Sequence, residues 1–268
     1  PLREILAAID RLAVGDFNAR INLKGSDELQ SLNMSFNHMA KELGSLEMLR
    51  VDFVNNFSHE FKTPIVSIRG FAKILKYDDL SREERNEYLD IIINESERLA
   101  ELSTNILNLS KIENQTIVTD KTIYNGSEQI RRIIALLQNR WLEKKIEINF
   151  DCDEIDFYGN IELLNQVWTN LIDNAIKFSP DNSSININII DESNNIVVTF
   201  INQGEEMSEE TIKRIFDKFY QGDISHSTRG NGIGLTLVKK IVELHEGYIN
   251  VTSSDVGTTF EVTIPKLY

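Results

Sequence analysis

The sequence predicts a multidomain protein with an all-α N-terminal half and an α/β sandwich as its C-terminal domain. Apolar residues recur with a helical period as far as about residue 113, which is typical of amphipathic helices with one buried face. After a polar linker at 114–119, β-branched residues alternate with polar ones instead, and that period of two indicates strands. A length of 268 residues favours two or three domains, which we place at 1–48, 49–114 and 115–268.

The composition narrows the class of partner. Acidic residues outnumber basic ones by 42 to 28, giving a net charge of −14, so nonspecific binding to nucleic acid or to an anionic membrane is disfavoured. The one cysteine, Cys152, excludes an intramolecular disulfide and suits a reducing cytosol. No apolar run approaches the ~18 residues of a membrane span, and we expect no signal peptide in these residues. A first residue of Pro rather than Met is consistent with a piece of a longer chain.

Residues 1 to about 50 are expected to form two short helices joined by an extended connector at 17–26. The first helix breaks at Gly15-Asp16, and the second carries apolar residues from Leu29 to Leu43. Helices this short do not bury their apolar faces alone, so we expect them to associate as a bundle. A generic helical hairpin is the simpler alternative.

A helix over about 46–77 carries a candidate nucleophile. Its phenylalanines at 53, 57 and 61 repeat every four residues. At about 100° per residue, His59 lies about 160–200° from the two neighbouring phenylalanines, so we expect its side chain to face solvent. Thr63 lies one turn further along the same face. For such a histidine in isolation, a plain surface residue would be the preferred interpretation.

The neighbours of His59 favour a chemical role. Imidazole is a good nucleophile at neutral pH when one ring nitrogen is free and the other is held. Glu60 is placed to hold the ring or to take its proton. Pro64 lacks an N–H and crowds the carbonyl of Glu60, so we expect the helix to bend or loosen near His59.

The following helix begins with a capping signal. Ser81 is followed three residues later by Glu84, a capping box, and the helix is expected to run to about Glu113. Two helices joined by a short turn make an antiparallel hairpin. Both helices have more apolar surface than one hairpin hides, so we expect two hairpins to pair into a dimeric four-helix bundle. A coiled-coil structural protein is the alternative, but it does not account for the exposed face of His59 and Thr63.

The C-terminal domain is predicted from five strands and three helices. Strands are expected at 146–150, 185–190, 196–201, 248–253 and 258–264, and helices at 127–144, 161–178 and 236–244.

Two asparagines lie on one face of the predicted helix 161–178. Asn170 and Asn174 are four residues apart, and Lys177 adds a positive charge near that face. Amide oxygens at this spacing are suited to holding a hard cation and orienting phosphates. A polar solvated face is the plain alternative.

A glycine-rich run precedes the last predicted helix. Residues 230–234 read Gly-Asn-Gly-Ile-Gly, and glycines let backbone N–H groups approach a phosphate beside a helix N-terminus. No strand precedes the run, so it is not the dinucleotide-binding fingerprint. The polar segment 221–229 before it is expected to act as a mobile lid.

The N-terminal half resembles sensor histidine kinases. The run 59–64 reads His-Glu-Phe-Lys-Thr-Pro and matches all six positions of their phosphoacceptor box. The resemblance implies that His59 accepts a phosphoryl group, with Glu60 as base or orienting group. In that family the His-Glu-x-x-Thr pattern, here ending at Thr63, accompanies phosphatase activity toward the response regulator.

Residues 1–48 are similar to a HAMP linker. The similarity lies in Pro1, the Gly15-Asp16 break, Asp27-Glu28-Leu29 and the run 36–40. It implies a parallel dimeric four-helix bundle that follows a transmembrane helix. A membrane segment and an outside sensor would then lie upstream of Pro1, and this chain would be the cytoplasmic portion of a bacterial membrane protein.

The C-terminal half resembles the GHKL ATPase (Bergerat) fold of histidine kinases. The run 166–178 is similar to their N box, in which the residue at Asn174 coordinates Mg²⁺ while those at Asn170 and Lys177 approach the phosphates of ATP. Phe178 closes that box. Gly230, Gly232, Gly234 and Leu235 resemble the second glycine box, and Phe219 belongs to a run, 216–220, that resembles the F box.

One motif departs from the family pattern. The first glycine box is usually Asp-x-Gly-x-Gly, and residues 202–206 here read Asn-Gln-Gly-Glu-Glu. In the family the aspartate accepts a hydrogen bond from the adenine amino group. The resemblance implies that Asn202 takes this place through its neutral amide oxygen, and a charge-assisted bond is about twice as strong. Gly204 is retained, whereas Glu206 replaces a glycine and would be strained at a positive φ.

The resemblance implies an ATP-dependent kinase that phosphorylates itself on His59 and passes the phosphoryl group to an aspartate of a response regulator. An ATP-driven conformational machine of the same fold is disfavoured, because those proteins lack the box around His59. A scaffold without kinase activity is the other alternative, motivated by Asn202 and Glu206. A nucleotide-binding titration distinguishes it.

Overall fold

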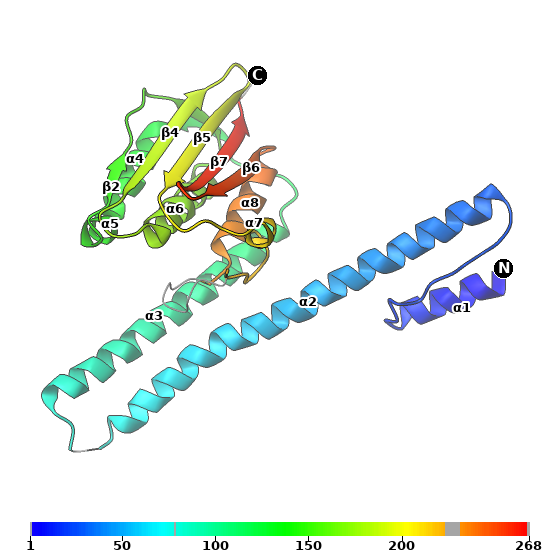
Figure 1. Cartoon of the computed structure of the whole chain (residues 1–268), viewed down its shortest axis with the longest axis horizontal. Coiled ribbons are helices and arrows are strands. Elements are labelled where there is room, and N and C mark those ends of the chain that lie inside the picture. The colour runs from blue at the N-terminus through cyan, green and yellow to red at the C-terminus, as the bar shows by residue number, and fades with distance from the viewer. Residues whose placement is uncertain (1, 78, 223–230, 267–268) are drawn as a thin grey trace. The chain divides into compact units, whose positions relative to one another are not determined.

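The computed structural model describes residues 2–77, 79–222 and 231–266, apart from the side chain of Leu49 (Figure 1). The chain divides into two compact units, Pro1–Val66 and Ser67–Tyr268. Among the described residues, none of the helices has both the length and the hydropathy needed to cross a membrane.

The first unit contains α1 (Leu2–Ala13) and most of α2 (Asp27–Ile74). The predicted connector is present as a non-helical segment between α1 and α2, with a turn at residues 17–18. Gly15 has φ +93° at the predicted break, and the amide of Asn37 bonds both backbone groups of Ile21, with N···O distances of 3.0 and 2.9 Å. The side chains of Ala8, Ile21, Leu23, Phe36 and Ala40 form a small core between the connector and the two helices.

The prediction of a separate short second helix is wrong, because α2 runs unbroken from Asp27 to Ile74. The sequence between the two predicted helices holds Gly44 as its weakest helix former, and an interior glycine costs only about 1 kcal/mol relative to alanine. The missing side chain is also used: a Cβ on Gly44 would lie 3.2 Å from the Cβ of Phe17. Pro64 likewise lies inside α2 without ending it.

Helix α3 (Arg82–Glu113) begins as its capping signal predicts. Ser81 Oγ accepts from the N–H of Glu84 at 3.1 Å, and the Glu84 carboxylate accepts from the N–H of Ser81 at 2.9 Å. The rings of Phe71 and Tyr88 pack with centroids 5.3 Å apart, which joins the end of α2 to the start of α3. Further along, α3 contacts α8 (Gly234–Leu244).

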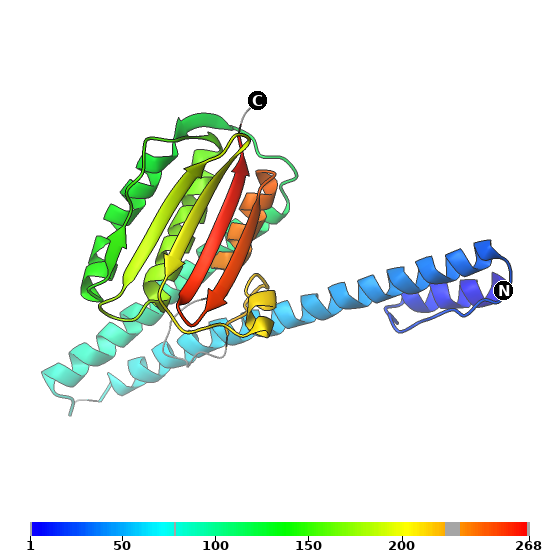
Figure 2. The same ribbon diagram turned by 45° about the horizontal axis from the view of Figure 1, so that its top comes forward.

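The rest of the second unit is a sheet with helices on one face (Figure 2). The five-stranded sheet has the order β2-β4-β5-β7-β6, in which only the β2–β4 pair is parallel. Its strands are β2 (Glu147–Asn149), β4 (Ser184–Asp191), β5 (Asn195–Asn202), β6 (Tyr248–Ser254) and β7 (Gly257–Pro265). The helices are α4 (Gly126–Leu136), α5 (Gln138–Glu143), α6 (Ile161–Phe178), the short α7 (Glu209–Arg214) and α8.

The five predicted strands are confirmed, and the α/β sandwich with them. The core lies between the sheet and α6, where the Trp168 ring packs 5.7 Å from Phe157 and 6.0 Å from Phe200, centroid to centroid. A second, two-stranded sheet of β1 (Thr122–Asn125) and β3 (Asp156–Gly159) was not predicted. Each of its strands has four residues, too few for a period to stand out.

The predicted helix 127–144 is two helices, α4 and α5, which meet at Leu137. The indole N–H of Trp141 donates to the carbonyl of Ile134 at 3.0 Å. In a continuous helix that carbonyl would accept from the N–H four residues on, so a local side-chain donor takes the place of a helical one at the break.

A buried histidine holds the start of α6. His245 is 2% exposed; its Nδ1 lies 2.8 Å from the carbonyl of Ile241, and its Nε2 accepts from the backbone N–H of Asn160 at 3.1 Å. Asn160 in turn caps α6 through the N–H of Leu163 at 3.0 Å. Because Nε2 accepts, the ring is neutral with its proton on Nδ1.

Stability should therefore fall in mild acid. Burial lowers the pKa of His245 below its usual value, with the hydrogen bond to Ile241 opposing that effect. A depressed pKa means that the unfolded chain binds more protons, so the free energy of unfolding decreases as pH falls below the unfolded value of about 6.5. We expect urea midpoints measured between pH 7.5 and 5 to fall less steeply in His245→Gln than in the parent. An equal decrease of the urea midpoint with pH in the two proteins would contradict this role of His245.

Candidate functional site

His59 lies on the exposed surface of α2 in the first unit, as predicted. Thr63 is also exposed, and its hydroxyl donates to the carbonyl of His59 at 3.2 Å. Glu60 is half-buried. The phenylalanine stripe is only half-buried within the single chain, with the Phe57 and Phe61 ring centroids 4.5 Å apart. The imidazole is thus accessible, and a hydroxyl lies one turn beyond it.

The asparagine face of α6 meets the N-terminus of α8 in the second unit. Asn170 donates from Nδ2 to the carbonyl of Gln166 at 2.7 Å, which orients its amide. Gly234, the first residue of α8, lies directly against that amide: a Cβ on Gly234 would be 2.6 Å from Asn170 Oδ1. Ile233 at the N-cap has no side-chain acceptor for the first-turn N–H groups of α8. These groups can bind an anion beside the amide face.

The other glycine of the described run is locked to the predicted F box. Gly232 has φ +62°, and a Cβ there would lie 2.6 Å from the carbonyl carbon of Phe219. The N–H of Phe219 donates to the carbonyl of Gly232 at 2.8 Å, and Phe219 is 6% exposed. Any side chain at 232 would be strained and would collide with the backbone, so only glycine suits this approach.

The first glycine box lies against the end of α6. Asn202, the last residue of β5, is 5% exposed and donates from Nδ2 to the carbonyl of Gln203 at 3.3 Å. A Cβ on Gly204 would be 2.9 Å from the carbonyl of Phe178 and 3.3 Å from Asn202 Nδ2. The structure thus brings Phe178, Asn202 and Gly204 together. Asn202 keeps its Oδ1 as a neutral acceptor.

Glu206 does not have the strained backbone that a positive φ would impose. Outside glycine, the described residues with positive φ are Asp120, Lys145, Asn182, Phe219 and Glu246, and Glu206 is not among them. Replacement of the family's glycine by Glu206 is therefore compatible with the backbone.

Lys177 lies on α6 three residues beyond Asn174, at the edge of the face that carries Asn170 and Asn174. Its Nζ is 4.7 Å from the centroid of the Phe178 ring. Burial lowers the pKa of Lys177, while the nearby carboxylates of Asp173 and Glu101 act to raise it. Lys177 also lines a hollow of about 530 Å³ whose other charged residues include Arg140 and Asp173, which form an ion pair.

Two predicted features fall on residues that the structure does not describe. Gly230 and most of the expected lid at 221–229 lie within 223–230. Asn174 is described and half-buried, one turn beyond Asn170.

Sequence reasoning missed Thr236, whose hydroxyl donates to the carbonyl of Phe216 at 2.9 Å and ties α8 to the F box. It was predicted only as the first residue of the helix 236–244.

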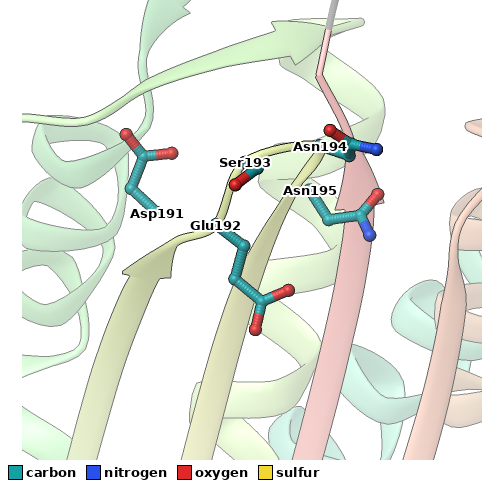
Figure 3. Close-up of a pocket in the computed structure, with 5 residues that line it drawn as sticks. All are labelled: Asp191, Glu192, Ser193, Asn194 and Asn195. Carbon is teal, nitrogen blue, oxygen red and sulfur yellow. The ribbon is translucent and has the colours of Figure 1, made fainter.

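A hollow of about 590 Å³ lies at the β4–β5 hairpin, and Figure 3 shows the residues that line it. It is lined by Asp191, Glu192, Ser193, Asn194 and Asn195. Strand β5 begins here at Asn195 and ends at Asn202 in the candidate site. None of the predicted site residues lines the hollow.

The amide face and the glycine cradle together suit Mg²⁺ and a polyphosphate. Asn174 offers an amide oxygen, a hard ligand for Mg²⁺, and phosphate oxygens would complete the coordination shell. Among the described residues there is no cluster of three or more His, Cys, Asp or Glu side chains for a metal. The amide oxygens and the backbone N–H groups present fit a cation that is bound together with a phosphate ligand.

Three domain families match successive parts of the chain. Residues 1–45 match the HAMP domain, residues 49–115 the His Kinase A (phospho-acceptor) domain, and residues 159–267 the histidine kinase-, DNA gyrase B- and HSP90-like ATPase.

Among curated proteins, the chain is similar to heme sensor proteins HssS. It is 35% identical over 267 residues to that of Staphylococcus haemolyticus and 35% identical over 268 residues to that of Staphylococcus aureus strain Newman. Each alignment covers 99% of this chain and 58% of the relative. The chain thus spans somewhat more than half the length of these relatives.

Solved histidine kinases share the fold. ThkA in complex with the response regulator protein TrrA superposes with a TM-score of 0.68 at 27% identity, over 81% of this chain and 61% of that one. Acinetobacter baumannii histidine kinase AdeS superposes with a TM-score of 0.65 at 22% identity, over 78% of this chain and 98% of that one.

Proposed function

Because the chain belongs to the sensor histidine kinases of two-component systems, we propose that it binds Mg-ATP beside α6 and α8 and phosphorylates itself on His59. An aspartate of a response regulator then receives the phosphoryl group. The observation that carries the proposal is the approach of Gly234 to the Asn170 amide, which joins a helix N-terminus to the amide face.

The residues of the second unit would bind and orient the nucleotide. Asn174 would hold Mg²⁺, and Asn170, Lys177 and the first-turn N–H groups of α8 would position the phosphates. Bound Mg²⁺ would neutralise charge on the phosphate oxygens. Asn202 Oδ1 would accept from the adenine amino group, and Phe178 and Gly204 lie beside it.

The residues of α2 would carry the transfer. One ring nitrogen of His59 would form the N–P bond as the γ-phosphoryl group leaves ADP. Glu60 would orient the N–H of the other ring nitrogen or accept its proton. The exposure of His59 supports this assignment.

A homodimer and an upstream membrane segment belong to the same proposal. Apolar side chains remain exposed in the single chain on both helices of the first unit: Leu2, Leu6 and Ile9 on α1, and Leu43, Leu46, Val51 and Val54 on α2. Pairing of two chains would cover them. The matched ranges support domains close to 1–48, 49–114 and 115–268. The HAMP match supports placing this chain on the cytoplasmic side, behind a transmembrane sensor.

Incubation with γ-labelled ATP tests the kinase. The labelled protein should release its phosphate in acid and keep it in base, as a phosphoramidate does. A scaffold without kinase activity would remain unlabelled, and failure to bind nucleotide in a titration would identify it.

Thr63 is proposed to serve the reverse reaction. Its hydroxyl lies one turn from His59, where it could orient a water toward a phosphorylated aspartate docked at the histidine. We expect Thr63→Ala to retain much of the autophosphorylation and transfer but to lose most dephosphorylation of the regulator. The measurement is the decay of purified phospho-regulator with added kinase and ADP.

Thr63→Ser is the matched control, because it keeps the hydroxyl and its bond to the carbonyl of His59. Equal decay with the parent and with Thr63→Ala would remove Thr63 from the mechanism. Loss of both reactions together would mean that Thr63 only shapes α2.

A further inference from the structure

The last turn of α6 carries Lys177 and Phe178 and directly follows Asn174, all three assigned above to Mg²⁺ or nucleotide, so its position matters for binding. A helix leaves its last four carbonyls without helical partners. Here Ala175 O accepts from the N–H of Ser179 at 3.1 Å. The carbonyl of Phe178 lies against Gly204. The carbonyls of Ile176 and Lys177 are the other two of these four.

Both are bonded by one side chain from another element. Nζ of Lys144, the C-cap residue of α5, donates to the carbonyls of Ile176 at 3.0 Å, Lys177 at 2.8 Å and Ser179 at 2.9 Å. An ammonium has three protons, so all of its donors are used. Its charge also complements the negative end of the helix dipole.

The backbone of Lys144 restrains the next loop as well. Its carbonyl accepts from the N–H of Asn182 at 2.9 Å, and Asn182 has a left-handed backbone with φ +60°. The chain from Ile176 to Asn182 is thus held to a single residue, which contacts the helix end through its side chain and the loop through its backbone.

We propose that Lys144 is a positioning residue for the nucleotide. It holds the last turn of α6 so that Phe178 stays against Gly204 and Lys177 keeps its place beside the amide face. This inference rests on the proposed function, and it assigns Lys144 no contact with the nucleotide itself.

The test is Lys144→Met, which keeps the aliphatic stem and removes the three donors. The other end of α6 is held separately by Asn160 and His245, so the change should be confined to the last turn. Loss of charge-assisted hydrogen bonds of this kind should raise the Kd for Mg-ATP about tenfold. The KM for ATP should rise in parallel, while the rate of autophosphorylation at saturating ATP should stay at the parental value.

Lys145→Met is the matched control, because it removes the same charge from the adjacent, exposed residue and should leave the Kd unchanged. A merely structural role for Lys144 would lower the saturating rate with the folded fraction and leave KM unchanged. That result would overturn the proposal. So would an equal Kd for Mg-ATP in the parent and Lys144→Met, or an equal rise of the Kd in Lys144→Met and Lys145→Met. If Lys144→Met does not fold, Lys144→Gln carries the same test. Failure of the parent to bind Mg-ATP would overturn the proposed function instead.

Discussion

Changing His59 to Gln should abolish the transfer of labelled phosphate from ATP to the protein while leaving the Kd for Mg-ATP unchanged. The glutamine side chain has no nucleophilic ring nitrogen, so no N–P bond forms. His59 is exposed on α2 in the first unit, whereas the proposed nucleotide ligands all lie in the second unit. The measurement is acid-labile label after incubation with ATP, paired with calorimetry of Mg-ATP binding.

His38→Gln is the control, since His38 is an exposed histidine on the same helix, 3.9 Å from the carboxylate of Glu42. This variant should label like the parent. Acid-labile phosphate remaining in His59→Gln would show that another residue accepts the phosphoryl group.

Changing Asn174 to Ala should remove Mg²⁺-dependent binding of ATP and autophosphorylation together. The amide oxygen would be lost as a ligand, and the phosphates would lose their cation bridge to α6. Outer-shell partners of metal sites already cost about 10- to 100-fold in affinity when they are removed, so a direct ligand should cost at least as much. Calorimetry with ATP, in Mg²⁺ and again in EDTA, should show that the variant in Mg²⁺ resembles the parent in EDTA.

Asn165→Ala provides the matched control, because Asn165 is an exposed asparagine of the same helix and lies about 140° around the helix from Asn170. It should bind Mg-ATP like the parent. Parental affinity in Asn174→Ala would remove this residue from the cation site.

Local chemistry accounts for the elements that the sequence predicted well. Helix α6 occupies 161–178 as expected, because Asn160 caps it and Pro180 follows its end, where the residue before a proline is biased away from helix. Ser81 and Glu84 make both bonds of the capping box. His59 is exposed because a period of about 3.6 residues sets it opposite the phenylalanines. Each of these signals lies within a few residues of the feature that it determines.

Prediction fails where a contact that the periodic pattern does not report decides the local structure. The indole N–H of Trp141 donates to the carbonyl of Ile134 where one expected helix is divided into α4 and α5. Strands β1 and β3 are too short to show a period and exist because they pair with each other. Helix α2 runs unbroken through Gly44, and Phe17 occupies the space beside this glycine.

By itself the sequence determined the helices and strands with long periods, the exposed face of His59 and the residue types suited to phosphate and Mg²⁺. Only the tertiary structure decided which of these residues meet: Gly234 with Asn170, Gly204 with Phe178, and Lys144 with the end of α6. A helical or strand period reports which way a side chain faces on its own element. It carries no information on which distant segment will pack there, because that depends on how whole elements fill the core together.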